Sequence, residues 1–441
     1  MSDAGNASGL AGGNHVPPDW RECPQCGLIS KMPVLRSGFI ADCPRCRHGL
    51  WRMRQHPFNY PIACGLAASL FYGFSLVAPF LEISAYGRFQ LAKIATGPAQ
   101  LLQQGFTMVG LLVLAVTIIF PGIKLGIMLV TLIGIETRFL PARFLKAMFR
   151  WYEPIRPWAM IDVYLLGFLV AYTRLIAMAS VHLDTALYSL IGLMISMAAA
   201  DSALDAETVW RALDLADKKS GRNPGQPKDN SSLKLIGCHC CDLVNRARPG
   251  DQCSRCRATL HIRKADSIGR SWAFLIAAAL LYVPANVFPV MTITELGQAT
   301  TFTIMGGIVE LINAGLWPLA LLVFFASITI PLMKLLTLGY MLLQTQMRSS
   351  MHLLGRTRAF RIIEFVGRWS MIDVFMISIL VALVRFGQFT NIQASPGAPC
   401  FAAVVVLTMF AVDGFDSRLM WDATKRQTKK SQEIPAKAAL R

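Results

Sequence analysis

Paired Cys-x-x-Cys motifs stand just ahead of a long apolar segment, and this arrangement occurs twice along the 441-residue chain. Two residues between the cysteines let both thiolates of one knuckle reach a single tetrahedral ion, and two knuckles supply four sulfur ligands. We therefore predict two zinc ribbons, whose ligands are Cys23, Cys26, Cys43, Cys46, Cys238, Cys241, Cys253 and Cys256. Because cysteine fills all four positions of each site, we expect two structural Zn²⁺ ions rather than catalytic ions or redox dithiol pairs.

The second ribbon is shorter between its knuckles than the first, and either His239 or Cys240 could substitute for one of its ligands. A ribbon of this size buries little core, so the metal is expected to supply most of its folding free energy. Thiolate ligands need a reducing compartment or prompt metallation. Both ribbons are therefore predicted to lie in the cytoplasm.

The composition is typical of a polytopic membrane protein, with 54% hydrophobic and only 16% charged residues. The first twenty residues have no apolar region of the kind found in a cleavable signal peptide. The formal net charge of +17 comes from basic residues beside apolar runs, which favours membrane topology over nucleic-acid binding. Four apolar helical spans are predicted in each half, at 58–81, 106–135, 159–180 and 185–200, and at 271–293, 311–343, 370–389 and 400–412.

The two halves of the chain are homologous repeats. Pro79, Gly97, Pro121 and Lys124 recur as Pro289, Gly307, Pro331 and Lys334 at one constant offset. After one inserted residue, the motif Trp-x-Met-Ile-Asp-Val recurs in the same way, from Trp158 and from Trp369. We predict an all-α polytopic membrane protein with two parallel repeats of a four-helix transmembrane unit, each preceded by a small cytoplasmic zinc ribbon.

Lysine and arginine are concentrated between the second and third spans of each half. These segments contain Arg138, Arg143, Lys146, Arg150 and Arg156 in the first half, and Arg348, Arg356, Arg358, Arg361 and Arg368 in the second. The positive-inside rule therefore predicts a bacterial inner-membrane protein whose basic segments, ribbons and both termini are cytoplasmic. An even number of spans per unit makes the repeats parallel.

These patterns divide the chain into seven predicted segments. They are a disordered N-terminus (1–20), zinc ribbon 1 (21–55), transmembrane unit 1 (56–200), a solvated linker (201–232), zinc ribbon 2 (233–265), transmembrane unit 2 (266–415) and a cytoplasmic tail (416–441).

Two lysines are predicted to lie inside the membrane, because Lys124 and Lys334 each follow a proline by three residues within an apolar run. A charge at the centre of a span costs about 2.5–3.5 kcal/mol, so it indicates a partner or a watery cavity. Pro121 and Pro331 are expected to kink the helix and to free a carbonyl near the lysine. The alternative is that each lysine snorkels to the cytoplasmic interface.

The third span of each unit is predicted to carry charges of opposite sign near its two ends, Asp162 with Arg174 and Asp373 with Arg385. These are candidate polar stations for transport, with Lys124 reaching Asp162 and Lys334 reaching Asp373. The alternative is that each aspartate marks the cytoplasmic N-terminus of its helix, where the dipole stabilises a carboxylate. No motif of a nucleotide-binding or hydrolytic enzyme is found, so we do not expect an enzyme.

The combination of these motifs resembles the paraquat-inducible protein A family. The resemblance is carried by the paired knuckles, each closed by Cys-x-Arg-Cys, and by Pro-x-x-Lys and Trp-x-Met-Ile-Asp-Val in both halves, and it covers about residues 21–421. It implies an inner-membrane component that works with a periplasmic MCE-domain protein, whose tunnel carries phospholipid between the inner and outer membranes. The residues alone leave two alternatives open, an ion-coupled small-molecule transporter and a thiol- or zinc-dependent membrane stress sensor.

Overall fold

A computed structural model describes residues 20–33, 38–52, 57–85, 88–176, 180–219, 233–295, 298–349, 351–383 and 390–422. Within these residues eight helical stretches are long and apolar enough to cross a membrane, four in each half, which confirms the predicted two-unit membrane architecture. The helices of the spans are α1 (Asn59–Val77), α3 (Thr107–Leu114) with α4 (Phe120–Thr137), α7 (Ile161–Ile176), α8 (Thr185–Ala203), α10 (Ser267–Val287), α12 (Trp317–Phe324) with α13 (Ile330–Gln346), α15 (Ile372–Leu383) and α16 (Gly397–Gly414). The predicted disordered N-terminus, apart from Trp20, and the tail beyond residue 422 lie outside the described residues.

Each unit closes by packing its first span against its last, α1 against α8 and α10 against α16. In the second unit the Ser271 hydroxyl donates a hydrogen bond to the Ala411 carbonyl at 3.0 Å. Small residues allow this approach, since a Cβ added to Gly414 would lie 3.2 Å from the Ser271 hydroxyl oxygen. The first and last spans of each unit are therefore neighbours, as in an antiparallel bundle.

A π-helical turn precedes the proline in the second span of both units, at Ala115–Ile119 and at Phe325–Thr329. Proline cannot donate the regular backbone hydrogen bond, and a π-turn is one way in which a helix accommodates its absence. A tyrosine of the first span hydrogen-bonds a carbonyl in each turn. Tyr72 donates to Ile118 at 2.6 Å, and Tyr282 donates to Ile328 at 3.3 Å.

A three-stranded antiparallel sheet closes the same end of each unit, which the all-helical prediction missed. β5 (Leu81–Ala85) lies between β6 (Arg88–Ala92) and β7 (Ser180–Leu183), and β10 (Met291–Glu295) lies between β11 (Gln298–Phe302) and β12 (Thr390–Ala394). The first strand of each sheet begins within four residues of the end of an apolar helix. Residues 81 and 291–293 were therefore read as continuations of the preceding spans, although each is the start of a strand.

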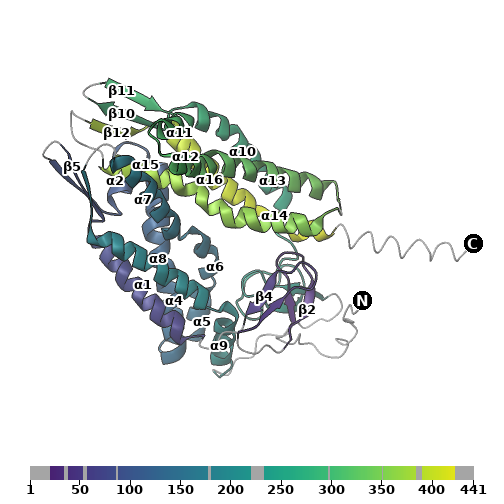
Figure 1. Cartoon of the computed structure of the whole chain (residues 1–441). Helices are drawn as coiled ribbons and strands as arrows, with labels where there is room; N and C mark the ends of the chain where they lie inside the picture. The colour runs from purple at the N-terminus through teal and green to yellow at the C-terminus, as the bar shows by residue number, and fades with distance from the viewer. Residues whose placement is uncertain are drawn as a thin grey trace, which may run out of the picture.

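The two units meet through α7 and α15, and α2 (Thr96–Gln103) also packs on α15. Glycine permits both contacts, because a Cβ at Gly167 would lie 2.8 Å from the Cβ of Phe375, and one at Gly97 would lie 2.8 Å from the Ser378 carbonyl oxygen. Figure 1 shows the units joined near the two sheets, with the ribbons at the opposite end of the molecule. In the second unit α11 (Ile304–Asn313) occupies the position that α2 has in the first.

Helices continue each third span on the side of the ribbons, where a basic connecting segment was expected. In the first unit these are α5 (Ala142–Phe149), α6 (Tyr152–Ile155) and the 3₁₀ turn Arg156–Trp158. In the second they are α14 (Leu353–Val366) and the 3₁₀ turn Gly367–Met371, so that the stretch Leu353–Ala382 is continuous. The α-helices of the third spans themselves begin at Ile161 and Ile372, close to the predicted starts 159 and 370.

The first part of the predicted linker is an ordered helix, α9 (Ala206–Lys219), which packs on α4 and α5. Its apolar residues Val209, Trp210 and Leu213 are buried, and the Trp210 ring packs edge-on against Phe149 with 5.2 Å between ring centroids. An amphipathic helix can bury one face while its composition stays polar, and this is why the segment reads as a solvated linker. Residues 220–232 of the linker lie outside the described residues.

The ribbons are built from short hairpins. The first contains β1 (Trp20–Glu22) paired with β2 (Ile29–Lys31), and β3 (Ile40–Asp42) paired with β4 (Gly49–Arg52). The second contains β8 (Lys234–Gly237) paired with β9 (Val244–Ala247), and a single bridge between Gln252 and Thr259. The two ribbons contact each other through β1, β8 and β9.

Candidate functional site

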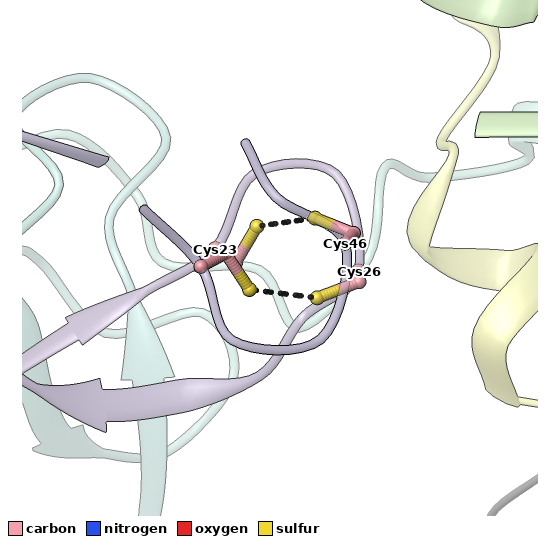
Figure 2. Close-up of side chains that lie close together, drawn as sticks. Cys23, Cys26 and Cys46 are labelled. Atoms are coloured by element: carbon pink, nitrogen blue, oxygen red, sulfur yellow. Dashed lines mark hydrogen bonds between the residues drawn. The ribbon is translucent and has the colours of Figure 1, made fainter. Parts of the chain in front are cut away.

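The structure gathers the eight predicted cysteines into two buried clusters of four, each able to hold a metal ion. Within each cluster the four sulfur atoms lie within 4.8 Å of one another. Figure 2 shows the sulfur atoms of Cys23, Cys26 and Cys46 turned toward one another. Tetrahedral Zn²⁺ with Zn–S bonds of about 2.3 Å requires sulfur atoms roughly 3.8 Å apart. The Cys23–Cys46 and Cys26–Cys43 separations are 3.5 and 3.6 Å, and the Cys238–Cys256 and Cys241–Cys253 separations are 3.4 and 3.6 Å, so both clusters fit this ion.

All four knuckles share one backbone geometry. The N–H of each first cysteine bonds the carbonyl five residues later, and the residue after each second cysteine donates back to the carbonyl of the first. That residue has a positive φ in every knuckle, which only glycine adopts without strain, yet glycine occupies only one of the four positions. The four residues are Gly27 (65°), Arg47 (55°), Asp242 (55°) and Arg257 (59°).

Without a cation, the surroundings of Cys46 in the first cluster disfavour its thiolate. Burial, together with the negative charge of Cys23, raises the pKa of the Cys46 thiol to about 12. A metal ion reverses this preference, because it stabilises the anionic sulfur that it binds. Binding of the ion by Cys46 therefore releases the proton of its thiol.

Neither suggested substitute ligand belongs to the second cluster. The His239 ring lies against the Arg418 guanidinium, with the shorter nitrogen–nitrogen distance 2.8 Å. Cys240 contributes its backbone N–H, which donates to the Cys238 sulfur at 3.4 Å. The Asn245 side chain donates to the Cys253 sulfur at 3.5 Å, and its oxygen accepts from the Ser254 hydroxyl. The polar surroundings of these sulfurs thus come from Cys240 and Asn245.

Glu207 of α9 joins both ribbons to the first membrane unit. Its carboxylate pairs with Arg21 of ribbon 1, with Arg255 of ribbon 2 at 2.9 Å and with Arg211 of its own helix at 2.7 Å. Burial alone would raise the pKa of Glu207, but the charges of Arg21 and Arg255 outweigh burial and hold the pKa below its ordinary value. Arg255 also pairs with Asp214 of α9 at 2.7 Å.

Ribbon 1 precedes the first unit in the chain but packs against the second. Its four cysteines belong to one buried apolar cluster with residues of the second unit, among them Phe360 and Trp421. The Arg361 guanidinium donates to the Cys46 carbonyl at 2.8 Å, and Arg45 lies over the Trp421 ring. Glu22 of the same ribbon pairs with Arg418 at 2.9 Å and accepts from the N–H of Gly237 in ribbon 2 at 2.8 Å. Ribbon 1 is thus held both by ribbon 2 and by the end of the second unit.

Lys124 is buried, with 3% of its surface exposed, and its ammonium pairs with Asp201 rather than with the predicted Asp162. The Nζ–Oδ2 distance is 2.6 Å, and the second oxygen of Asp201 accepts from the Tyr152 hydroxyl at 2.9 Å. Asp162 is exposed. Asp201 was assigned to the linker because a span predicted from hydropathy is taken to end before its first charged residue. In the structure α8 continues to Ala203.

Lys334 is buried equally deeply, and its ammonium contacts neutral oxygens rather than the predicted Asp373. It donates to the Gly367 carbonyl at 2.7 Å, to the Ser370 hydroxyl at 2.9 Å and to the Thr408 hydroxyl at 3.4 Å. No carboxylate of the described chain forms an ion pair with it. Both lysine side chains are buried within the protein.

Asp373 is 4% exposed and lines a cavity of about 30 Å³ in the second unit. The other walls are mainly apolar and include Met291, Phe302 and Phe401. The volume suffices for one or two water molecules. Asp373 lies in the first turn of α15, as Asp162 does in α7, which agrees with the alternative that each aspartate marks the N-terminus of its helix. Of the two arginines predicted with the aspartates, Arg174 is part of α7, and Arg385 lies outside the described residues.

Sequence reasoning missed three residues that organise the site, namely Asp201, Glu207 and Trp421. A signal for the first was present, because Met197-Ala-Ala-Ala-Asp201 and Met409-Phe-Ala-Val-Asp413 occupy corresponding places in the last spans of the two units. Glu207 and Trp421 act through contacts between residues that are distant in the chain. No periodic pattern in a single sequence predicts such contacts.

A family model described as paraquat-inducible protein A matches the chain twice, over residues 58–214 and 268–425. Each match covers one membrane unit and the segment that follows it, and neither includes a ribbon. The duplication inferred from recurring residues is therefore also a duplication of the family domain.

Relatives with assigned names match almost the whole chain. The intermembrane transport protein PqiA of Escherichia coli strain K12 is 31% identical over 408 residues, which cover 91% of this chain and 95% of the relative. The lipophilic envelope-spanning tunnel protein A of the same organism is 29% identical, with 92% of each chain covered. A probable intermembrane transport protein of Haemophilus influenzae is 25% identical, covering 92% of this chain and 96% of the relative. No solved structure matches the chain.

Proposed function

The chain belongs to the paraquat-inducible protein A family, and from this membership we propose that it passes phospholipid between the bacterial inner membrane and a periplasmic tunnel of MCE-domain protein. Two relatives support this role, because one is named an intermembrane transport protein and another a lipophilic envelope-spanning tunnel protein. In this proposal the chain is an inner-membrane component with its ribbons and both termini in the cytoplasm, and the sheets β5–β7 and β10–β12 face the periplasm. The basic residues of α5 and α14 lie at the ribbon end, as the positive-inside rule requires for that orientation.

The observation that carries the proposal is the setting of Lys334. A buried ammonium without a paired carboxylate is costly inside a membrane protein, and such groups mark ion or substrate pathways. Among the described residues, Lys334 donates only to neutral oxygens, those of Gly367, Ser370 and Thr408. An anionic lipid headgroup would supply the missing negative charge. We therefore assign Lys334 and Asp373 to headgroup handling in the second unit.

The first unit has the same lysine in a neutralised setting, which supports a structural role there. Lys124 is paired with Asp201, and the positions of Gly367 and Ser370 are taken by Arg156 and Ala159. A side chain at position 367 would crowd the ammonium, since a Cβ there would lie 3.0 Å from Lys334 Cε. Gly367 thus makes room for Lys334 in the second unit alone.

We propose that each four-cysteine cluster holds one structural Zn²⁺ ion. The all-sulfur ligand set, its burial and its spacing fit zinc, and cysteine occupies every ligand position. The ions would fix the ribbons, which in turn tie α9 to the end of the second unit. No step of transport is assigned to the metal.

Transfer of a labelled phospholipid from proteoliposomes to the MCE-domain partner tests the role of Lys334. Lys334→Met and Asp373→Asn are expected to reduce transfer to background while the thermal unfolding temperature stays close to that of the wild type. The matched control is Lys124→Met/Asp201→Asn, which removes both charges of the first unit together and is expected to preserve transfer.

Normal transfer by a stably folded Lys334→Met protein would contradict the proposed role of Lys334.

A purification from native membranes in mild detergent tests the partner separately. We expect an MCE-domain protein and phospholipid to be recovered with the chain. Recovery of the zinc-loaded chain without either would favour an independent small-molecule transporter or a stress sensor.

A further inference from the structure

A cavity of about 330 Å³ lies between ribbon 1 and the first half of α14. Half of its lining residues are arginines, namely Arg47 from the ribbon and Arg358 and Arg361 from the helix. Cys46, Leu354 and Gly355 complete the lining. The volume is much larger than one water molecule occupies and suits a small anion.

The three guanidinium groups are not neutralised by acidic side chains. Among the described residues, no carboxylate forms an ion pair with any of the three. Arg361 donates through Nη2 to the Cys46 carbonyl at 2.8 Å, and this bond fixes its guanidinium at the cavity. Its Nε is buried and has no hydrogen-bond acceptor among the described protein atoms. Like positive charges held close together without counter-charges favour an anion between them.

The corresponding place in the first unit is built differently. There α9 covers α5, and Lys146 of α5 pairs with Asp214 at 3.0 Å and with Asp217 at 2.9 Å. After the second unit, the described aspartates Asp416 and Asp422 are engaged with Arg418 and Arg263 instead. The remaining nineteen residues, 423–441, contain six basic residues and one acidic residue, so they offer little negative charge. Within the described part of the chain, the second unit thus has no acidic helix placed as α9 is in the first unit.

The start of α14 adds backbone donors to the cavity. Leu354 and Gly355 belong to the first turn of this 14-residue helix, where backbone N–H groups have no partner within the helix and the dipole favours an anion. A Cβ added to Gly355 would meet no atom within 4 Å, so packing does not require glycine there. Glycine in a helix costs about 1 kcal/mol relative to alanine. Glycine at position 355 instead leaves the backbone N–H groups of this turn accessible from the cavity.

We propose that this cavity binds a phosphate group through Arg47, Arg358 and Arg361. The planar guanidinium group bonds phosphate oxygens in a bidentate manner, and this selects phosphate over a simple halide. Two sources share this chemistry, the headgroup of an anionic phospholipid and free inorganic phosphate. The site lies at the ribbon end of the helical stretch Leu353–Ala382, which is long and apolar enough to cross a membrane, and the neighbouring side chains of Met351 and Leu354 are 69% and 55% exposed. The proposal does not depend on transport, since a cytoplasmic-side anion site can exist in a scaffold as well.

The experiment uses the zinc-loaded full chain and the variant Arg47→Gln/Arg358→Gln. Both side chains are exposed and form no ion pair with any described residue, so folding is expected to survive their loss. The matched control is Arg138→Gln/Arg143→Gln, which removes two exposed arginines at the same end of the first unit, one of them also with positive φ. Arg361 is left intact because it also anchors Cys46.

Two probes separate the sources. One is inorganic phosphate, titrated against the detergent-solubilised protein by calorimetry. The other is phosphatidylglycerol in phosphatidylcholine nanodiscs, with retained lipid counted by native mass spectrometry. We expect the wild type and the control to bind at least one probe about tenfold more tightly than Arg47→Gln/Arg358→Gln does. Binding of phosphatidylglycerol alone identifies the lipid as the source, and binding of phosphate identifies the free anion. Absence of binding to both probes, or equal binding by the variant, overturns the proposal.

Discussion

Lys124 Nζ lies 2.6 Å from Asp201 Oδ2, and this ion pair joins the second span of the first unit to its last. Asp201 is therefore predicted to stabilise the fold. Asp201→Asn should destabilise the protein by about 3 kcal/mol, because it leaves a buried ammonium without its counter-charge. Lys124→Met/Asp201→Asn should recover most of that loss. Thermal unfolding in detergent measures both variants, and a double variant no more stable than Asp201→Asn would contradict the argument.

The carboxylate of Glu207 is predicted to hold the two ribbons on α9. Glu207→Gln should lower the free energy of unfolding by about 3 kcal/mol, since buried Arg21 would lose the carboxylate that it pairs with and Arg255 would keep only Asp214. Glu153→Gln is the matched control. Glu153 and its partner Arg156 are each nearly half exposed, so that change should cost less than about 1 kcal/mol. Equal effects of the two substitutions on the unfolding transition would show that the Glu207 carboxylate does not hold the ribbons on α9.

The low pKa of Glu207 predicts acid sensitivity of the same contact. A carboxyl group whose pKa is lower in the folded protein stabilises the fold above its ordinary pKa, and this contribution is lost as the pH falls through the lower, folded value. The unfolding temperature of the wild type should therefore fall more steeply below about pH 4.5 than that of Glu207→Gln. Parallel pH profiles for the two proteins would show that Glu207 does not titrate in this way.

Metal loading is predicted to be two Zn²⁺ ions per chain and to depend on pH. Since burial and the charge of Cys23 raise the pKa of the Cys46 thiol to about 12, the metal-free thiol is protonated at neutral pH and must lose its proton to bind. Zinc affinity should therefore fall as the pH is lowered from about 8 to about 5, with proton release on rebinding. Competition with a chromophoric chelator measures the affinity, and serine at Cys46 should remove one of the two ions. Loading that is independent of pH would exclude thiolate ligation.

The positive φ after each second cysteine predicts opposite effects of two substitutions. Arg257→Gly should stabilise ribbon 2 by about 1 kcal/mol, because glycine removes the strain of that conformation. Gly27→Ala should destabilise ribbon 1 by about 1–2 kcal/mol, and its Cβ would also lie 3.3 Å from Arg263 Nη2. The unfolding transitions of zinc-loaded protein test both changes. Two shifts of the same sign would show that φ is not the deciding factor.

The sequence predicted the parts of this molecule that depend on local pattern. Eight spans follow from apolar runs, and the cysteine clusters follow from the spacing within each knuckle. The partner of Lys124 was predicted wrongly because Asp201 lies in α8, a span distant in the chain. Lys334 was assigned to Asp373, but it bonds Gly367 and Ser370, which lie just before that residue, and Thr408 of α16. The three-stranded sheets β5–β7 and β10–β12 were missed because strands such as Leu81–Ala85 are too short to display an alternating pattern beside an apolar helix.

Ribbon 1 precedes the first unit in the chain but packs against the second, and this placement has a consequence for synthesis. Ribbon 1 leaves the ribosome first, whereas Trp421, over which Arg45 lies, is among the last described residues to be made. The first ribbon must therefore wait for almost the whole chain before its apolar surface is covered. A chain cut between residues 219 and 233 should likewise remain associated as two fragments. Glu22 contacts Gly237 and Arg418, and Glu207 contacts Arg255, so these contacts join the two fragments.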